Sequence, residues 1–232
     1  MSVVSATGLE GAIEQAVAAL DVERIKKEYW EQNECVHLKA FLPPEVVEQY
    51  FVPRVGSLKP KLNRNYIPGR KKGASVSYFT VREEAPEFMT LYRSPAFLEF
   101  LKRLTNAPLQ FCPETDPHSC ALYYYTEPGD YIGWHYDTSY YKGARYTILL
   151  GLVDRSPSCK LVCQLYKDDP SRPMKELSPS TGPGDVVIFN GDKLWHAVTP
   201  LGEGEERTVL TMEYVTDPGM NPFKRLYSNL KD

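Results

Sequence analysis

Five short runs of β-branched and aromatic residues in the second half of the chain constrain its fold more than any other feature. The runs are CALYYYT, RYTILLGLV, CKLVCQLY, DVVIFN and RTVLTMEYV, at residues 120–126, 145–153, 159–166, 185–190 and 207–215. Residues of these types are enriched in strands, and turn residues separate one run from the next. Five closely spaced strands after a helical region predict a mainly β fold in the α+β class, an antiparallel barrel or sandwich with helices packed on one outer face.

The first half of the chain has a different pattern. Apolar residues recur at helical spacing over residues 9–32 and 94–105, which predicts two helices, and residues 45–52 predict a third. VHLKAF at residues 36–41 alternates like a strand. Residues 56–73 are rich in Lys, Arg, Asn and Pro and have no clear period, so we expect a long loop there.

Length and composition predict a single domain over residues 1–232. The chain is 42% hydrophobic and contains no repeat or low-complexity block, so one core is the simplest organisation. We expect residues 1–110 to form a mostly helical support and residues 120–216 to form the β core that carries the functional site.

Charge and cysteine content restrict the partners and the compartment. A formal net charge of −3 and a pI near 5.9 do not favour nucleic acid as a partner. Residues 1–20 lack a basic n-region and read as an amphipathic helix rather than a signal peptide, and no segment is predicted to span a membrane. The five cysteines are odd in number and lack CxxC spacing, which indicates reduced thiols in a cytoplasmic protein.

The segment YIGWHYDTS places His135 and Asp137 two positions apart. A strand directs residues i and i+2 to the same face, so both side chains can point at one metal ion. Taken alone, a His-x-Asp pair is more often part of a hydrogen-bonded turn than of a ligand set. A metal site therefore needs further ligands from elsewhere in the chain.

His196 supplies a third candidate ligand, because it follows the strand DVVIFN and a Gly-Asp turn and has apolar neighbours. Two histidines and one carboxylate can bind one face of Fe(II) and leave the opposite positions open. Trp134 and Trp195 each adjoin a candidate ligand, and we expect them to point to the other strand face and pack against the helices.

Arg207 begins the last of the five strands, eleven residues after His196. If its guanidinium faces the barrel interior, it requires a carboxylate partner, and the planar fork suits bidentate binding. The alternative is an exposed arginine at a strand start beside Glu205 and Glu206.

The order HYD, HAV and then arginine on successive strands resembles the Fe(II)- and 2-oxoglutarate-dependent oxygenases, specifically their prolyl-hydroxylase-like branch. The resemblance covers about residues 121–215 and implies a double-stranded β-helix, a jelly-roll barrel with supporting N-terminal helices. It implies that Fe(II) is bound by His135, Asp137 and His196. It also implies that 2-oxoglutarate and O₂ are cosubstrates, with Arg207 on the distal carboxylate of 2-oxoglutarate.

The remaining family positions are matched less closely. A tyrosine on the strand before the first ligand often contacts the cosubstrate in this branch, and Tyr125 or Tyr123 can serve, with Tyr125 preferred. The usual Gly-Gly between the middle strands is replaced by DRSPSCKLVCQLY, so we assign no cosubstrate contact there. Related halogenases carry Gly or Ala where this chain has Asp137. The carboxylate at this position therefore favours hydroxylation over halogenation. Desaturation uses the same metal ligands, so it is left as an alternative reaction.

The expected substrate is a free amino acid or a similar small zwitterion. If Arg207 faces the interior, so do Thr211 and Glu213, and Glu213 is then available for a substrate ammonium group. Arg70 is the candidate for a substrate carboxylate. The chain also resembles the amino-acid hydroxylases and halogenases that act on free lysine-like substrates, which adds His118 and Thr138 as substrate contacts.

Each of these assignments has a structural alternative. Glu213 can pair with a surface lysine, Arg70 can belong to a solvated loop, and His118 can cap a turn. At the level of function, a protein or peptidyl-residue hydroxylase and a non-redox, cupin-like metal-binding barrel are the alternatives to a small-molecule hydroxylase. The cupin-like metal-binding barrel has no evident use for an arginine at position 207.

Overall fold

The computed structural model of the chain describes residues 6–137, 139 and 141–219. The α-helices are α1 (Ala6–Ala18), α2 (Val22–Glu31), α3 (Pro44–Val46), α4 (Val52–Leu58), α5 (Tyr78–Glu84), α6 (Pro86–Tyr92) and α7 (Pro95–Thr105). A π-helical turn at Val47–Phe51 joins α3 to α4, and a 3₁₀ turn at Lys59–Lys61 follows α4. Proline stands within the first turn of α3, α4, α6 and α7, where its missing N–H group leaves no helical hydrogen bond unmade.

Twelve strands form one antiparallel sheet within the described residues. They are β1 (Cys35–Leu38), β2 (Asn63–Ile67), β3 (Lys71–Val76), β4 (Gln110–Phe111), β5 (Cys120–Tyr125), β6 (Tyr131–His135), β7 (Arg145–Arg155), β8 (Leu161–Leu165), β9 (Lys175–Leu177), β10 (Val186–Asn190), β11 (Trp195–Val198) and β12 (Glu206–Val215). The five strands predicted from the second half of the sequence are β5, β7, β8, β10 and β12.

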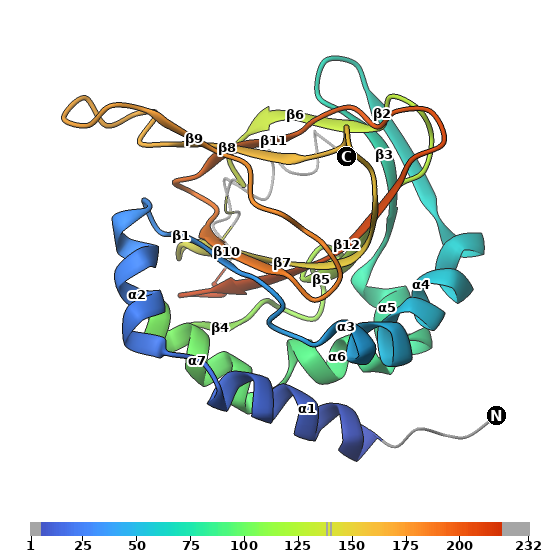
Figure 1. The fold of residues 1–232 in the computed structure, drawn as a ribbon, viewed down its shortest axis with the longest axis horizontal. Helices are drawn as coiled ribbons and strands as arrows, with labels where there is room; N and C mark the ends of the chain where they lie inside the picture. Colours follow the sequence, from blue (N-terminus) through green and yellow to red (C-terminus); the bar gives the residue numbers. More distant parts are fainter. Residues whose placement is uncertain (1–5, 138, 140, 220–232) are drawn as a thin grey trace.

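The sheet curls so that its two halves face each other (Figure 1). The strand order is β1-β10-β7-β12-β5-β3-β6-β11-β8-β9, and β3 connects the two halves by pairing with both β5 and β6. Helices α1, α2, α6 and α7 lie along the outer face of the half formed by β10, β7, β12 and β5. The mainly β fold class and the helical cover of one face are therefore confirmed.

Alternation along the strands divides the core into two layers. On β7, Ile148 and Leu150 belong to the large apolar cluster beneath the helices, whereas Leu149 belongs to a second cluster inside the barrel. The same period of two runs along β12, where Leu210 and Met212 face the helices. Residues of the opposite parity, among them Val209, line the barrel interior and create its cavity.

Two predicted elements differ from the structure. The single helix expected over residues 9–32 is two helices, because Asp21 caps α2 by accepting a hydrogen bond from the backbone N–H of Arg24. The prediction of a long loop over residues 56–73 is wrong, because this segment contains the end of α4, a 3₁₀ turn and most of the hairpin β2–β3. The hairpin pairs with β5 and β6, and this long-range pairing overrides the weak local pattern.

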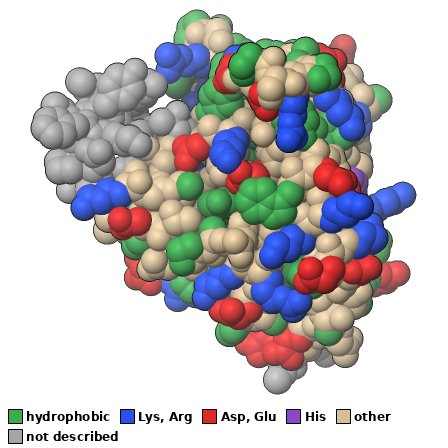
Figure 2. Space-filling model, turned by 90° about the vertical axis from the view of Figure 1, so that its left-hand side faces the viewer, with side chains coloured by type: hydrophobic (Ala, Val, Ile, Leu, Met, Phe, Trp, Pro, Cys, Tyr) green, Lys and Arg blue, Asp and Glu red, His purple; other side chains and the backbone are tan. Residues whose placement is uncertain are grey.

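The outer surface corrects a further expectation. Trp134 and Trp195 do not pack on helices, because β6 and β11 belong to the half of the sheet that the helices leave uncovered. Their rings are parallel, with centroids 6.4 Å apart, and Trp134 is 42% exposed. The face shown in Figure 2 carries intermixed Lys, Arg, Asp and Glu side chains, with no continuous area of one sign. No helix in the described part of the chain has the length and apolarity that a membrane span requires.

Candidate active site

The three predicted metal ligands meet inside the barrel. His135 ends β6 and His196 lies on β11, and the two residues are direct partners in the antiparallel register. Their ring centroids are 4.2 Å apart. Asp137 follows two residues after β6, and one ligand atom from each of the three residues lies within 4.8 Å of the others.

Hydrogen bonds orient both imidazole rings toward one point. Nδ1 of His135 lies 2.8 Å from the carbonyl oxygen of Gly133, and Nδ1 of His196 lies 3.0 Å from that of Leu194. Each Nε2 therefore points inward, at 3.3 Å and 3.7 Å from Oδ1 of Asp137. A carbonyl partner on Nδ1 fixes the tautomer that leaves Nε2 available to a metal ion.

The charge states of the cluster suit a divalent cation. Burial raises the pKa of Asp137, but His196 and His135 outweigh it and hold the pKa below its ordinary value. Burial lowers the pKa of His196, whereas at His135 burial is outweighed by the hydrogen bond and charge of Asp137, which raise the pKa. Two imidazoles and an ionised carboxylate are the donor set that Fe(II) accepts, and metal binding displaces a proton from an imidazole that carries one, so the residues fit the metal that the sequence implies.

Gly191 holds Asp137 in position, and the sequence analysis missed it. The backbone N–H of Asp137 donates to the carbonyl oxygen of Gly191 at 3.0 Å. A Cβ atom at residue 191 would lie 2.8 Å from Cβ of Asp137, which is closer than real Cβ atoms approach. Glycine at residue 191 therefore allows the turn before β11 to approach Asp137 closely.

Arg207 lies inside the barrel and is 1% exposed, so the alternative of a solvent-exposed arginine is wrong. Its Nε donates to Oγ1 of Thr181 at 3.1 Å, and its guanidinium carbon lies 5.1 Å from the ring centroid of Tyr125. Nη1 and Nη2 have no hydrogen-bond partner among the described residues. Two buried, unpaired donors in a planar fork fit the carboxylate of a bound molecule.

Thr181 reaches Arg207 because strand β7, over which the Thr181 loop passes, contains a glycine at residue 151. A Cβ atom at residue 151 of β7 would lie 2.1 Å from the carbonyl oxygen of Thr181, so the loop before β10 approaches β7 this closely because residue 151 is glycine. The sequence offered no signal for this contact, which joins residues that are 26 positions apart.

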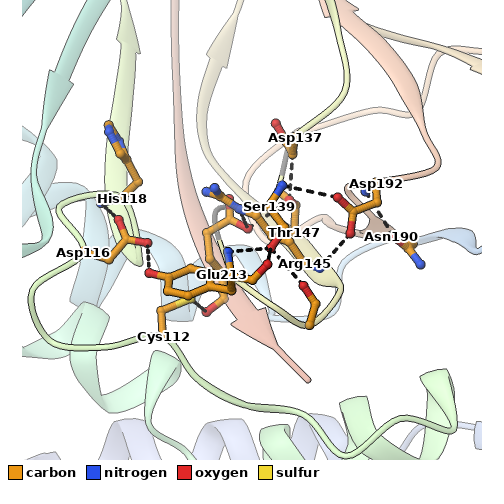
Figure 3. A network of polar contacts seen from close by, with 12 residues as sticks. Cys112, Asp116, His118, Asp137, Ser139, Arg145, Thr147, Asn190, Asp192 and Glu213 are labelled. Carbon is orange, nitrogen blue, oxygen red and sulfur yellow. Dashed lines mark hydrogen bonds and ion pairs between the residues drawn. The ribbon is translucent and has the colours of Figure 1, made fainter. Parts of the chain in front are cut away.

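A second cluster of polar side chains lies near Asp137 (Figure 3). Arg145 at the start of β7 forms an ion pair with Glu213 of β12, with Nε 2.8 Å from Oε2. Oγ1 of Thr147 lies 2.7 Å from Oδ2 of Asp137 and 3.0 Å from Oε2 of Glu213. Burial raises the pKa of Glu213 to about 7, while Arg145 opposes the rise. The partner of Glu213 is thus an internal arginine, and the alternative of a surface lysine is wrong.

One cavity joins these groups. Its lining includes the metal-ligand cluster, Arg207, both candidate cosubstrate tyrosines Tyr123 and Tyr125, and the candidate substrate contacts Thr211 and Glu213. It also includes Arg145 and Thr147, which the sequence analysis did not identify. The sequence could have indicated them, because residues 145, 147 and 149 lie on the same face of β7, a strand that was correctly predicted.

The other candidate substrate contacts lie elsewhere. Arg70 is exposed in the turn between β2 and β3 and does not line the cavity. His118 is half-buried behind the cavity wall, with its Nδ1 3.4 Å from the hydroxyl of Tyr123 and its backbone N–H bonded to Asp116. Thr138 lies outside the described residues.

Comparison with known proteins connects this geometry to a fold. No protein-family model matches the chain, and no curated protein is significantly similar to it in sequence. A prolyl-4-hydroxylase from Pseudomonas putida superposes with a TM-score of 0.65 at 15% identity, covering 85% of this chain and 100% of that one. A prolyl hydroxylase from Trichoplax adhaerens, in complex with a hypoxia-inducible factor peptide, gives 0.66 at 14% identity and covers 92% and 94%.

A third structure was solved with ligands. The epimerase SnoN in complex with Fe³⁺, α-ketoglutarate and nogalamycin RO superposes with a TM-score of 0.65 at 16% identity, covering 84% of this chain and 83% of that one. At these identities the comparison concerns the fold. The chain has the double-stranded β-helix fold of the 2-oxoglutarate- and Fe(II)-dependent oxygenases, and the resemblance to their prolyl-hydroxylase-like branch is confirmed at that level.

Proposed function

We propose that the protein is an Fe(II)- and 2-oxoglutarate-dependent dioxygenase that hydroxylates an unactivated C–H bond of a small molecule. The observation that carries this proposal is the buried fork of Arg207, whose Nη1 and Nη2 lack partners among the described residues and which lines the same cavity as the metal-ligand cluster. A non-redox metal-binding barrel would have no use for this costly group.

The chain's own residues supply binding and geometry. His135, Asp137 and His196 hold one face of the metal, and Arg207 orients the cosubstrate through its distal carboxylate. When bound, Fe(II) and 2-oxoglutarate activate O₂ and oxidise the substrate, with release of succinate and CO₂. Apolar side chains between these groups exclude water from the reacting atoms; they are Leu149, Leu161, Phe189 and Val198.

The substrate that we propose is a free amino acid or a similar zwitterion. The cavity exposes a guanidinium, Arg145, and a carboxylate, Glu213, close together, so it offers partners for both charges of such a molecule. The second candidate is a peptidyl-residue hydroxylase, because one structural neighbour was solved with a peptide fragment bound. We also propose a cytoplasmic location, which the five buried, free cysteines support.

Succinate formation tests the proposed function. The Fe(II)-loaded protein is incubated with 2-oxoglutarate under air, with each free amino acid in turn, and Asp137→Ala is the control. We expect succinate formation that one class of amino acid stimulates and that the control variant lacks. Stimulation by peptides alone would favour the second candidate, and the absence of both turnover and anaerobic 2-oxoglutarate binding would refute the dioxygenase.

A further inference from the structure

The cavity has two charged ends along β12, with Arg207 at one end and the pair of Glu213 with Arg145 at the other. Arg207 and Glu213 are six residues apart on β12 with side chains on the same face, which separates their backbones by roughly 20 Å at the usual rise of a strand. Arg145 extends to Glu213 from the neighbouring strand β7. The Arg207 end is the candidate cosubstrate end, so the Arg145 end is left for the substrate.

The ion pair at this end uses only part of its hydrogen-bonding capacity. Arg145 donates to Glu213 through Nε, and no bond from its Nη1 or Nη2 is found within the described residues. Oε2 of Glu213 accepts from Nε of Arg145 and lies 3.0 Å from Oγ1 of Thr147, whereas Oε1 has no bond among the described residues. Both side chains are nevertheless buried, at 11% and 3% exposed. Because both residues line the cavity, the atoms that the pair does not use are available to a ligand there.

We propose that Arg145 and Glu213 together bind the head group of a free α-amino acid. Nη1 and Nη2 of Arg145 bind the α-carboxylate as a bidentate fork, and Oε1 of Glu213 accepts from the α-ammonium group. The inference rests on the proposed function, whose substrate class it makes specific. It gives Arg145 the role that the sequence analysis assigned to Arg70.

The charge balance of the pair selects this class of ligand. Arg145 and Glu213 neutralise each other, so a ligand with one charge would leave a net charge in a buried site. An α-amino acid carries both charges on groups attached to one carbon and adds no net charge. A residue inside a peptide chain carries neither charge at its backbone, so the pair also discriminates against peptidyl substrates.

The position of the pair couples the head group to the metal site (Figure 3). Thr147 lies between Glu213 and Asp137, within hydrogen-bond distance of both carboxylates. A head group held by the pair would therefore lie one side chain away from a metal ligand. This arrangement brings the carbon chain of the amino acid toward the metal and the cosubstrate.

Binding to a redox-inactive form of the protein tests the inference without turnover. The Zn(II)-loaded protein with 2-oxoglutarate is titrated calorimetrically with each of the standard free amino acids. The strongest ligand is then compared with its α-amide and its N-acetyl derivative. We expect at least one amino acid to bind and each derivative to bind at least tenfold more weakly. Absence of binding by every amino acid, or equal binding of the derivatives, would overturn the inference.

Variants assign the two contacts to their residues. Arg145→Lys keeps the charge but loses the fork, and Glu213→Gln keeps the shape but loses the charge. Arg145→Lys should lower the affinity for the parent amino acid at least tenfold but barely change the affinity for the α-amide. Glu213→Gln should also lower the affinity for the parent amino acid at least tenfold but barely change the affinity for the N-acetyl derivative. Arg54→Lys is the matched control, because Arg54 forms a bidentate pair with Glu87 away from the cavity.

A double variant guards against loss of folding. Removing one partner of a buried pair leaves the other uncompensated, whereas replacing both by apolar residues is often neutral for stability. Arg145→Met with Glu213→Leu should therefore fold, retain 2-oxoglutarate binding and lose amino-acid binding. If the double variant still binds the amino acid with wild-type affinity, the inference is wrong.

The two proposals fail in different ways. If wild-type protein binds 2-oxoglutarate but no amino acid, the dioxygenase stands and the head-group site is refuted. If an amino acid binds and depends on Arg145 and Glu213 while 2-oxoglutarate does not bind, the head-group site stands and the dioxygenase is refuted.

Discussion

Arg207 and Arg145 are both buried arginines that line the same cavity, yet their surroundings are opposite. Arg207 is 1% exposed and has a threonine hydroxyl and an aromatic ring beside it, with no carboxylate bonded to it among the described residues. Arg145 is 9% exposed and pairs with Glu213. A buried cation without a counterion destabilises the ligand-free protein, whereas a paired cation is compensated by its partner, so that removing one member of the pair leaves the other charge uncompensated.

The two ends of the cavity therefore carry their charge differently, one as an unpaired cation and the other as an ion pair. At the Arg207 end, two guanidinium nitrogens have no partner among the described residues, so the counterion would have to be a bound anion. The Arg145 end carries its own counterion, so a ligand there meets a pair that is already charge-balanced and binds the atoms that the pair leaves free. Substitutions at the two ends should therefore change stability in opposite directions, although both should impair binding.

The largest effect is expected for Arg145→Met. The variant leaves Glu213 buried without its partner, and we expect the free energy of unfolding to fall by about 3–5 kcal/mol at pH 8. Burial already raises the pKa of Glu213 to about 7, and loss of Arg145 raises it further. A carboxyl group whose pKa is higher in the folded state loses stability as pH rises, so the deficit should be smaller at pH 6.

Urea unfolding of the metal-free protein at the two pH values measures this deficit. Arg54→Met is the matched control, since the Arg54 side chain is 41% exposed and its ion pair should contribute less than about 1 kcal/mol. An equal loss of stability in both variants would contradict the special position of Arg145.

Arg207→Met should act in the opposite direction on stability. Without ligands, the substitution removes a buried guanidinium with two unpaired nitrogens, so we expect the free energy of unfolding to rise by about 1–3 kcal/mol. Affinity for 2-oxoglutarate should fall at least about 30-fold, because the distal carboxylate loses its partner. Urea unfolding and calorimetric titration of the Zn(II) protein test the two effects, and a destabilised variant would show that Arg207 has a structural role.

A smaller effect is expected at Thr147, which lies beside Asp137, one of the three candidate metal ligands. Thr147→Val keeps the side-chain shape but removes the hydroxyl 2.7 Å from Oδ2 of Asp137, and we expect metal affinity to fall about tenfold. Thr208→Val is the control, because Thr208 is equally buried and its hydroxyl has no partner within the described part of the chain. Competitive Zn(II) titration should separate the two variants; equal affinities would exclude a positioning role for Thr147.

Much of the fold could be predicted because the relevant signals are local. Runs of β-branched and aromatic residues, with period two, located β5, β7, β8, β10 and β12. The His-x-Asp spacing and a third histidine after a turn made His135, Asp137 and His196 candidates, and the family resemblance added Arg207. The structure brings the four residues to one cavity. The hairpin β2–β3 escaped prediction because its pattern is weak and its pairing with β5 and β6 is long-range.

The sequence by itself determined the residue types of the site and the faces on which they lie, because side-chain direction along a strand follows from parity alone. Only the tertiary structure decided which of these residues meet. Arg145 and Glu213 are 68 positions apart, and their contact depends on the register of β7 against β12. Gly191 and Gly151 likewise matter only because other segments approach them. Register and close approach arise from the packing of the whole sheet, so no local pattern encodes them.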